Sequence, residues 1–324
     1  MAASQDLQPK EGHARPLVYV LILNYQSFED TLGCLQCARD SDYPNTRILV
    51  IDNASPDGSG DLLARQLNKQ DLMCLPVNTG YAGGNNTGIR QALQADAKYV
   101  FILNPDVRLD KQTISACVRF SEAHQDVGAV NPVQLADDGI SIDSKFRNAI
   151  LKPSGIDATT YDGGMIPDFL PVKDLLGAAL FLPAQAIERV GGFDDLYFAY
   201  GEETDLCRRL RYHGLQLAVL GRAPVRHLRT KELSATVADV ILFLRLKGIY
   251  LGILKDPWRS FGRSIRVMGA RFFEEVRGQG RDRYPFNQYP VTRWHSIRAF
   301  AWVLLHLFSI REHRRLEKLG RAHV

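Results

Sequence analysis

The chain has 324 residues, of which 45% are hydrophobic and 23% are charged, and this is ordinary for a folded globular protein. Its five cysteines are odd in number and lie in segments with regular patterns, which argues against a disulfide-stapled secreted protein. The longest uncharged apolar run near the C-terminus, residues 299–310, is too short to span a bilayer. We therefore expect free thiols and a cytoplasmic location.

The formal net charge of +4 is unevenly distributed along the chain. Residues 231–324 hold 18 lysines and arginines against 8 acidic residues, so the rest of the chain is acidic. This asymmetry predicts that the C-terminal third faces an anionic partner, such as a lipid surface or a phosphate-bearing ligand. A basic, solvated helical face explains it equally well.

Short apolar runs alternate with helical patterns over the first 130 residues. The runs predict strands buried on both faces, at residues 17–23, 47–51, 71–76, 99–103 and 127–130. Helical spacing of apolar residues lies between them, at residues 32–38, 57–67, 82–95 and 110–123. This alternation predicts an α/β fold with a Rossmann-like, mostly parallel central sheet flanked by helices.

Beyond residue 130 the pattern changes twice. Residues 131–174 lose their periodicity and gather turn residues, which is typical of a functional loop or a lid. Strand and helix patterns then return, at residues 177–182, 183–190, 202–212 and 216–220. After them the chain is helical, at residues 237–254, 260–276 and 294–310. We predict three parts: a disordered tail at 1–16, an α/β domain at 17–234 and a basic amphipathic helical region at 235–324.

Polar residues follow three predicted strands at the point where each strand ends: Asn24 with Tyr25, Asp52 with Asn53, and the tripeptide Asn104-Pro105-Asp106. In parallel α/β sheets ligands bind outside the carboxyl ends of the strands, so a ligand site is expected here. The Asp106 carboxylate could hold Mg²⁺ or Mn²⁺ on a diphosphate. As an isolated tripeptide, 104–106 is better explained as a turn in which Asp106 caps the next helix.

Two other segments admit both a binding role and a structural one. Asp52 could accept a hydrogen bond from the ring N–H of uracil or thymine, although alone it is better explained as a helix N-cap. Residues 78–86 hold three glycines and three asparagines before a helix, so the backbone there can approach a ligand closely. This segment matches neither common phosphate-loop pattern, which argues against a P-loop or a Rossmann cofactor site.

Acidic residues open the helix predicted at 202–212. Glu202, Glu203 and Asp205 lie in its first turn, where the helix dipole stabilises carboxylates. One of them could also act as a general base on an incoming hydroxyl. His227, beyond the last strand, is explained either as a packed residue or as a ligand, and the arginines around Arg209 either bind phosphate or are solvated.

In their order, these segments resemble the large family of inverting glycosyltransferases with a GT-A fold, often called family 2, over residues 17–234. The resemblance is carried by Leu23-Asn24-Tyr25, residues 50–55 (VIDNAS), 78–86 (NTGYAGGNN), 103–106 (LNPD), 177–179 (GAA), 190–194 (VGGFD), 202–207 (EETDLC) and His227. The similarity is greatest to the rhamnosyltransferase-like branch that builds bacterial surface polysaccharides.

The resemblance implies a role for each candidate residue. The nucleotide-sugar donor would be bound by Asn24, Tyr25, Asp52, Asn53, Ser55, Gly80, Tyr81, Asn85, Asn104 and Asp106. Asp106 and His227 would hold the divalent metal, Mg²⁺ or Mn²⁺, and the chain departs from the family's Asp-x-Asp form in offering one carboxylate there. Glu203 stands where the family has the aspartate that deprotonates the acceptor, and Glu202 is the alternative base. Asp205 and Arg209 would support the site.

The implied reaction is transfer of a sugar with inversion, with L-rhamnose from dTDP-rhamnose as the best guess. The acceptor would be a hydroxyl of a saccharide or of a polyprenyl-diphosphate-linked saccharide. A nucleotide-sugar-binding protein and a nucleotidyltransferase of the same α/β layout are the alternatives. Residues 235–324 are expected either to contact the inner face of the cell membrane or to form a helical cap, in a homodimer, and nucleic acid is not an expected partner.

Overall fold

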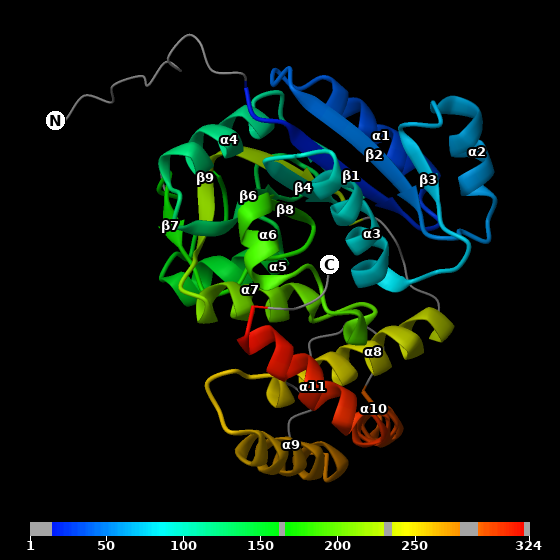
Figure 1. The fold of residues 1–324 in the computed structure, drawn as a ribbon, viewed down its shortest axis with the longest axis vertical. Coiled ribbons are helices and arrows are strands. Elements are labelled where there is room, and N and C mark those ends of the chain that lie inside the picture. Colours follow the sequence, from blue (N-terminus) through cyan, green and yellow to red (C-terminus); the bar gives the residue numbers. More distant parts are fainter. Residues whose placement is uncertain (1–14, 162–165, 230–234, 279–290, 321–324) are drawn as a thin grey trace, which may run out of the picture.

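The computed structural model describes residues 15–161, 166–229, 235–278 and 291–320. A nine-stranded sheet runs through its centre in the order β3-β2-β1-β4-β8-β6-β9-β5, with β7 paired to β9 (Figure 1). The strands are β1 (Val18–Asn24), β2 (Thr46–Asp52), β3 (Leu72–Cys74), β4 (Tyr99–Leu103), β5 (Val107–Leu109), β6 (Val127–Leu135), β7 (Leu170–Pro171), β8 (Ala179–Pro183) and β9 (Gln216–His227). The predicted α/β class is confirmed.

The two halves of the sheet differ in strand direction. Strands β3, β2, β1 and β4 are parallel, as strands joined by crossover helices must be. In the other half, β8 is antiparallel to β4 and β6, while β9 is parallel to β6 and antiparallel to β5 and β7. The parallel sheet expected from the sequence therefore lies in the first half, and the second half is mixed.

Helices cover both faces of the sheet, which explains why β1 and β4 are buried along their whole length. Side chains alternate across a strand, so Val18 and Ile22 pack toward one core and Leu21 and Leu23 toward the other. The first core is closed by α1 (Phe28–Arg39), α2 (Ser59–Gln66) and α4 (Thr113–Ala123). The second is closed by α3 (Gly80–Gln94), α6 (Ala184–Val190) and α7 (Glu202–Tyr212).

The segment 131–174 is more regular than its sequence suggests. β6 continues through Leu135, with the polar residues Asn131 and Gln134 fully buried in it. The Asn131 amide is bonded to backbone groups of Leu176 and Ala179, which lets a polar residue occupy a buried strand. The strand is followed by three short turns of helix, α5 (Ser144–Phe146), a π-helical turn (Arg147–Leu151) and a 3-10 turn (Lys152–Ser154).

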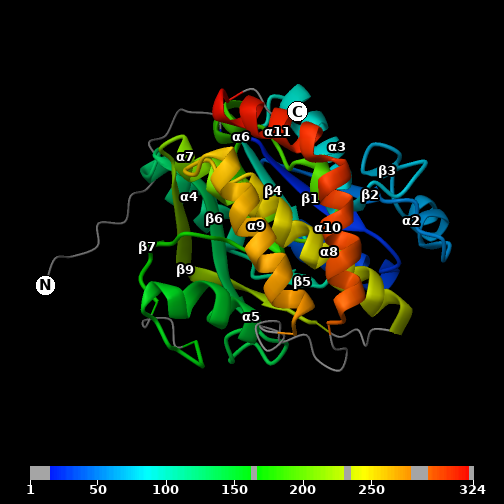
Figure 2. The same cartoon turned by 90° about the horizontal axis from the view of Figure 1, so that it is seen from below.

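In the described part of the chain beyond the sheet, the structure has four helices: α8 (Ala235–Leu254), α9 (Phe261–Val276), α10 (Arg293–Leu305) and α11 (Leu307–Lys318). They lie together below the sheet in Figure 1, and Figure 2 shows α9 and α10 side by side on the face seen from below. A third core holds them together and takes in Tyr197 from the preceding part of the chain. Among the described helices, none has both the length and the hydropathy to cross a membrane.

Three sequence predictions need correction or fall outside the description. The helix predicted at 110–123 begins only at Thr113, because the short strand β5 intervenes. The helix predicted at 294–310 is divided into α10 and α11 at His306. Most of the predicted tail, residues 1–14, and the predicted boundary at residue 234 lie outside the described residues, so the three-part division stays a prediction.

Candidate active site at the carboxyl edge of the sheet

The parallel strands β1 and β2 place Asn24 directly beside Asp52, because the two residues are register partners. The Asn24 amide donates to the Asp52 carboxylate at 2.7 Å, and the Ser55 hydroxyl and backbone N–H donate to it at 2.6 and 3.1 Å. Only 4% of Asp52 is exposed. Asp52, Asn24 and Ser55 therefore form one hydrogen-bonded group at the strand ends. The Asp52 side chain accepts from Ser55 within the loop, and α2 begins later, at Ser59, without a side-chain cap.

The backbone beside this group is held in unusual conformations. Gln26 and Ala54, each just beyond the end of a strand, have φ of 54° and 55°, in the left-handed region that non-glycine residues rarely adopt. Such strain persists where surrounding structure fixes it, and it is concentrated at ligand sites. Tyr25 lies between these strand ends and is 42% exposed, so its ring is available to a ligand.

The glycine-rich segment 78–86 becomes the first turns of α3. The Asn53 amide donates to the Gly80 carbonyl at 3.0 Å, which ties β2 to the start of this helix. Gly80 has φ +74°, and a Cβ there would lie 2.2 Å from the Phe198 carbonyl oxygen. Only glycine fits this position, where two distant parts of the chain cross.

Asn85, which the resemblance assigns to donor binding, is fully buried in α3. Its amide nitrogen donates back to the Tyr81 carbonyl at 2.9 Å, and its Oδ1 has no hydrogen-bond partner among the described residues. The neighbouring Asn86, by contrast, bonds to the backbone of Phe193 in both directions. Asn86 therefore anchors the helix, and the donor role of Asn85 stays a prediction.

Asp106 and His227 are brought together by a strand pairing that the sequence did not reveal. β5 pairs antiparallel with β9, with Val107 opposite His227. The Asp106 Oδ2 and His227 Nε2 atoms are 3.2 Å apart. Burial alone would raise the Asp106 pKa, but its hydrogen bond to His227 and the histidine's charge lower it overall. Asp106 caps no helix: β5 follows it, and the N-cap of α4 is Gln112. The explanation of residues 104–106 as a turn in which Asp106 caps the next helix is therefore wrong.

The Asp106 turn is supported by Arg108, which the sequence analysis missed. The guanidinium donates to the Pro105 carbonyl at 2.8 Å and contacts the Asp30 side chain at 3.5 Å. It also packs on Gly33, where a Cβ would lie 2.4 Å from it. Arg108 therefore holds the tripeptide against α1, and its role could not be read from its place in a three-residue strand.

Glu202 and Glu203 open α7, preceded by Gly201 at φ +104° and by Phe198 and Tyr200 at positive φ. The Glu202 side chain is buried, and its Oε2 has no hydrogen-bond partner among the described residues. Burial, together with the neighbouring Glu203 charge, raises the pKa of Glu202 well above its ordinary value. Glu203 is half-buried, and its carboxylate accepts from the Gly201 N–H at 3.2 Å.

Tyr81 shows that these acidic groups converge on one place. Its hydroxyl donates to the Gly177 carbonyl at 2.8 Å, and burial is the main cause that raises its pKa well above the ordinary value. The charges of Glu202, Glu203 and Asp106 raise this pKa further. Asp106, between β4 and β5, thus acts on the same buried phenol as Glu202 and Glu203, at the start of α7. In the sequence, Asp106 and Glu203 are 97 residues apart.

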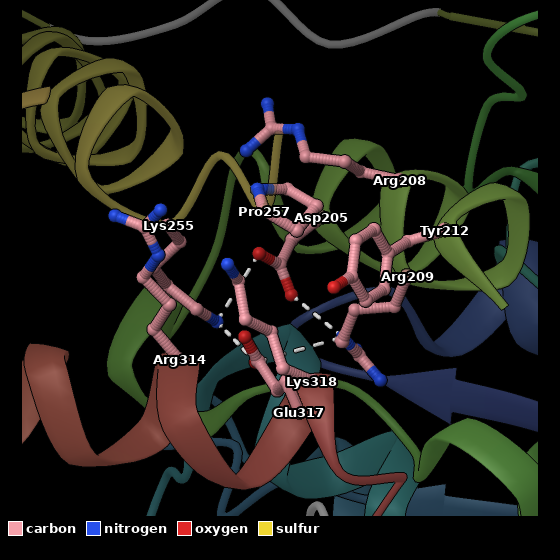
Figure 3. Close-up of a pocket in the computed structure, with 9 residues that line it drawn as sticks. All are labelled: Asp205, Arg208, Arg209, Tyr212, Lys255, Pro257, Arg314, Glu317 and Lys318. Atoms are coloured by element: carbon pink, nitrogen blue, oxygen red, sulfur yellow. Dashed lines mark hydrogen bonds and ion pairs between the residues drawn. The ribbon is translucent and has the colours of Figure 1, made fainter. Parts of the chain in front are cut away.

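Asp205 and Arg209 belong to a second group of charges, away from this edge. We call it the Lys255 cluster: Lys255, Arg209, Asp194, Asp205 and Glu317. Figure 3 shows Asp205 and Glu317 between the side chains of Lys255 and Arg209. The three carboxylates lie close enough to bind a metal ion, but the Lys255 ammonium already contacts all of them, at 3.1 Å for Asp205 and 2.5 Å for Glu317.

This cluster joins α7 to the C-terminal helices. Lys255 follows α8, Glu317 lies in α11, and both meet side chains of α7. Arg209 also donates to the Val190 and Gly192 carbonyls, which leaves it neither solvated nor directed at a phosphate. Asp205 and Arg209 thus pair with charges from a region that the sequence did not connect to them, and their support of the site stays a prediction.

A family model described as glycosyl transferase family 2 matches residues 19–168. Among curated proteins, the chain is 26% identical over 208 residues to the low-salt glycan biosynthesis hexosyltransferase Agl10 of Haloferax volcanii, covering 61% of this chain and 62% of that protein. It is 28% identical over 201 residues to the N-acetylglucosaminyl-diphospho-decaprenol L-rhamnosyltransferase of Mycobacterium tuberculosis, covering 56% and 66%. The matches therefore span slightly less than two thirds of these relatives. Rhamnosyltransferase WbbL of Escherichia coli is 25% identical over 215 residues, covering 62% and 79%.

Solved structures agree on the fold at low sequence identity. Staphylococcus aureus TarS residues 1–349 in complex with UDP-GlcNAc superposes with a TM-score of 0.56 at 14% identity, covering 94% of this chain and 88% of that one. The mannosyltransferase PcManGT from Pyrobaculum calidifontis, in complex with GDP-Man and Mn²⁺, gives 0.50 at 14% identity, covering 97% and 89%. The GT-A fold is thereby confirmed. The chain is therefore similar to family 2 glycosyltransferases over residues 19–168, and its similar curated proteins include two rhamnosyltransferases.

Proposed function

We propose that this protein transfers a sugar from a nucleoside diphosphate to a hydroxyl group, with inversion at the anomeric carbon. The observation that carries the proposal is the contact of Asp106 with His227 at 3.2 Å, together with Tyr81, on which the charges of Asp106 and Glu203 both act. A nucleotide held across β1 and β2 would direct its diphosphate toward Asp106, the next strand end in the sheet order.

The donor half of the site is built from the groups at β1, β2 and α3. Asp52 would accept the ring N–H of a pyrimidine base, with Asn24 and Ser55 orienting its carboxylate. The exposed ring of Tyr25 would pack against the base, and Asn53 keeps Gly80 close enough for backbone contact. Asn104 would line the diphosphate side, since its N–H is fixed by the Ala178 carbonyl at the end of β4.

The residues present fit a divalent metal ion. Two ligands at right angles around an ion with bonds of about 2.1 Å lie roughly 3 Å apart, close to the 3.2 Å between Asp106 Oδ2 and His227 Nε2. An imidazole nitrogen is a poorer ligand for Mg²⁺ than for Mn²⁺, which favours manganese. Such an ion would supply positive charge to the departing diphosphate.

Glu203 is the proposed general base. The acceptor O–H proton would pass to its carboxylate while the oxygen forms a bond to the anomeric carbon and the carbon–phosphate oxygen bond breaks. A base must be ionised to accept this proton, and burial disfavours the ionised form of Glu202 by raising its pKa. We therefore assign proton acceptance to Glu203, and Glu202 is its buried neighbour.

The donor sugar and acceptor are inferred from the relatives alone. Two of them are rhamnosyltransferases, and one acts on a decaprenyl-diphosphate-linked sugar by its name. We therefore propose L-rhamnose from dTDP-rhamnose as donor and a polyprenyl-diphosphate-linked saccharide as acceptor. A nucleotide-sugar-binding protein remains the second candidate, and the presence of a half-buried, ionisable Glu203 beside the donor edge argues against it.

The proposal is tested with a panel of nucleotide sugars and the full-length protein. The protein should hydrolyse dTDP-rhamnose faster than UDP-GlcNAc or GDP-mannose, or be protected by it more strongly. Both effects should depend on added Mn²⁺. Preference for another donor would overturn the rhamnose assignment alone. Binding of every donor without transfer or hydrolysis, with and without lipid-linked acceptor, would favour the binding protein instead.

A further inference from the structure

The C-terminal helices expose an apolar stripe to solvent. Leu305 and Phe308 are 84% and 80% exposed, Trp294 is 61% exposed, and Leu304 and Ile297 are 47% and 40% exposed. In α10 these positions recur every three or four residues, so they lie on one side of the helix. The opposite side holds Ala299 and Val303, which are fully buried in the third core.

Other aromatic residues of these helices pack inward. Phe300 stacks on Phe272 with ring centroids 4.0 Å apart, and Lys247 lies over the Trp302 ring at 4.5 Å. Trp258 is exposed, but it packs against Arg211 and Tyr212 of α7. The most exposed apolar side chains of α10 and α11 are therefore Leu305, Phe308 and Trp294.

Arginines border the stripe. On α9 the exposed side carries Arg263, Arg266 and Arg277 together with Phe273, which is 61% exposed, while Ser264 and Met268 face inward. Arg293 begins α10, and Arg311 and Arg315 continue on the exposed side of α11. Figure 2 shows α9 and α10 side by side, and α11 packs on α10. We call the exposed sides of these three helices, with the apolar stripe and the arginines, the α9–α11 face.

We propose that the α9–α11 face is a docking surface for an anionic lipid bilayer. Projecting apolar side chains between arginines are the pattern of helices that lie in a membrane interface, where the apolar groups enter the acyl boundary and the cations meet phosphate. Charge decides against a second copy as the occupant, because a two-fold contact would bring the same arginines against each other. A bilayer supplies both the apolar layer and the compensating negative charge.

The docking does not rest on the proposed glycosyl transfer, although it would serve it. Helix α8 passes from this region to the candidate site, where Gly248 approaches the Tyr200 carbonyl so closely that a Cβ would lie 2.2 Å from it. A bilayer on the α9–α11 face would therefore be coupled to the backbone just before Glu202 through one helix. A lipid-borne acceptor would then lie within the length of α8 from the candidate site.

The test is sedimentation of the full-length protein with vesicles of phosphatidylcholine, either alone or with about 30% phosphatidylglycerol. Wild type should bind the anionic vesicles. Leu305→Ser with Phe308→Ser should weaken binding by about tenfold or more, because two largely exposed side chains no longer enter the bilayer. Arg263→Gln with Arg266→Gln should weaken it roughly fivefold per charge at low salt and little at high salt.

The matched control is Leu62→Ser with Ile140→Ser, which removes two exposed apolar side chains, 42% and 62% exposed, elsewhere on the molecule. It should bind vesicles as wild type does. Wild type that ignores anionic vesicles would overturn the proposal, as would equal loss in the control. Light scattering that shows a dimer abolished by the Leu305 and Phe308 substitutions, with no vesicle binding, would identify a self-association face instead. Donor hydrolysis without vesicles should be unchanged in every variant, which separates this test from that of the proposed function.

Discussion

Two groups of buried and half-buried charges meet helix α7, one at its first residues and one from Asp205 onward, and they are built in different ways. In the first, the charges of Glu202, Glu203 and Asp106 act together on Tyr81, and His227 contacts Asp106 directly. One helical turn further, the Lys255 cluster sets three carboxylates against Lys255 and Arg209, which satisfy them. Cations act on the first group at longer range, because Lys145 and Lys247 lower the pKa of Glu202 and Arg229 lowers that of Asp106. Carboxylates compensated only at longer range indicate a place where a ligand can add charge, whereas direct ion pairs indicate structure.

The pKa directions follow the same division. Burial raises the pKa of both Glu202 and Asp205, but the ammonium of Lys255 and the guanidinium of Arg209 reverse this for Asp205 and lower its pKa overall. For Lys255 burial lowers the pKa, and the surrounding carboxylates raise it overall. Neighbours of opposite charge therefore favour the ionised forms of Asp205 and Lys255, while burial disfavours the ionised form of Glu202.

The largest effect is expected from Glu203→Gln, which removes the proposed base and changes little else. Transfer should fall about a thousandfold, within the range that general bases contribute, while donor affinity and unfolding midpoint stay near wild type. Steady-state kinetics with donor titration measures this. Turnover within a few-fold of wild type would remove Glu203 from the mechanism and direct attention to Glu202.

Lys255→Met should break the compensated group and act on stability rather than on chemistry. It leaves Asp194, Asp205 and Glu317 buried without their shared cation, which costs about 3–5 kcal/mol in the free energy of unfolding. Urea unfolding measures the loss. Lys255→Arg is the conservative control, expected to keep part of the stability. A Met variant as stable as wild type would show that the cluster contributes no net stabilisation.

Asp106→Asn, unlike Lys255→Met, should act on donor binding rather than on stability. Donor affinity should fall about tenfold when Mn²⁺ is present and little when it is absent, while stability changes by less than about 1 kcal/mol, because Asp106 is partly exposed. Isothermal titration with and without the metal compares the two conditions. An equal loss in both would mean that Asp106 contacts the donor without a metal ion.

The smallest effect is a pH-dependent one at Glu202. Its pKa is raised by folding, so it favours the folded state fully below its unfolded pKa and less as pH rises through the folded value. Glu202→Gln should therefore be close to neutral in stability at acidic pH and stabilising at alkaline pH. Thermal unfolding across pH 4 to 9, with Glu203→Gln as the control, measures this, and a difference independent of pH would show that Glu202 is not held protonated.

Some of this site could be predicted from the sequence, because local chemistry fixed it. Asp52 and Asn24 end apolar runs that are buried on both sides, and such runs form neighbouring parallel strands whose ends share an edge. Glu202 and Glu203 stand at a helix start for a similar local reason, preceded by Gly201 at positive φ. The residues expected at the carboxyl edge are found there for these reasons, while their chemical roles stay predictions.

Other features were decided only by tertiary structure, because they depend on pairings between distant segments. The β5–β9 pairing that unites Asp106 with His227 involves a three-residue strand too short to show a pattern. The burial of Asn85 inside α3, where its amide donates to the Tyr81 carbonyl, was likewise not evident from the sequence. The burial of Lys255 among three carboxylates, and the exposure of Leu305 and Phe308, likewise follow from how four helices pack, and helical periodicity alone does not tell the inward face from the outward one.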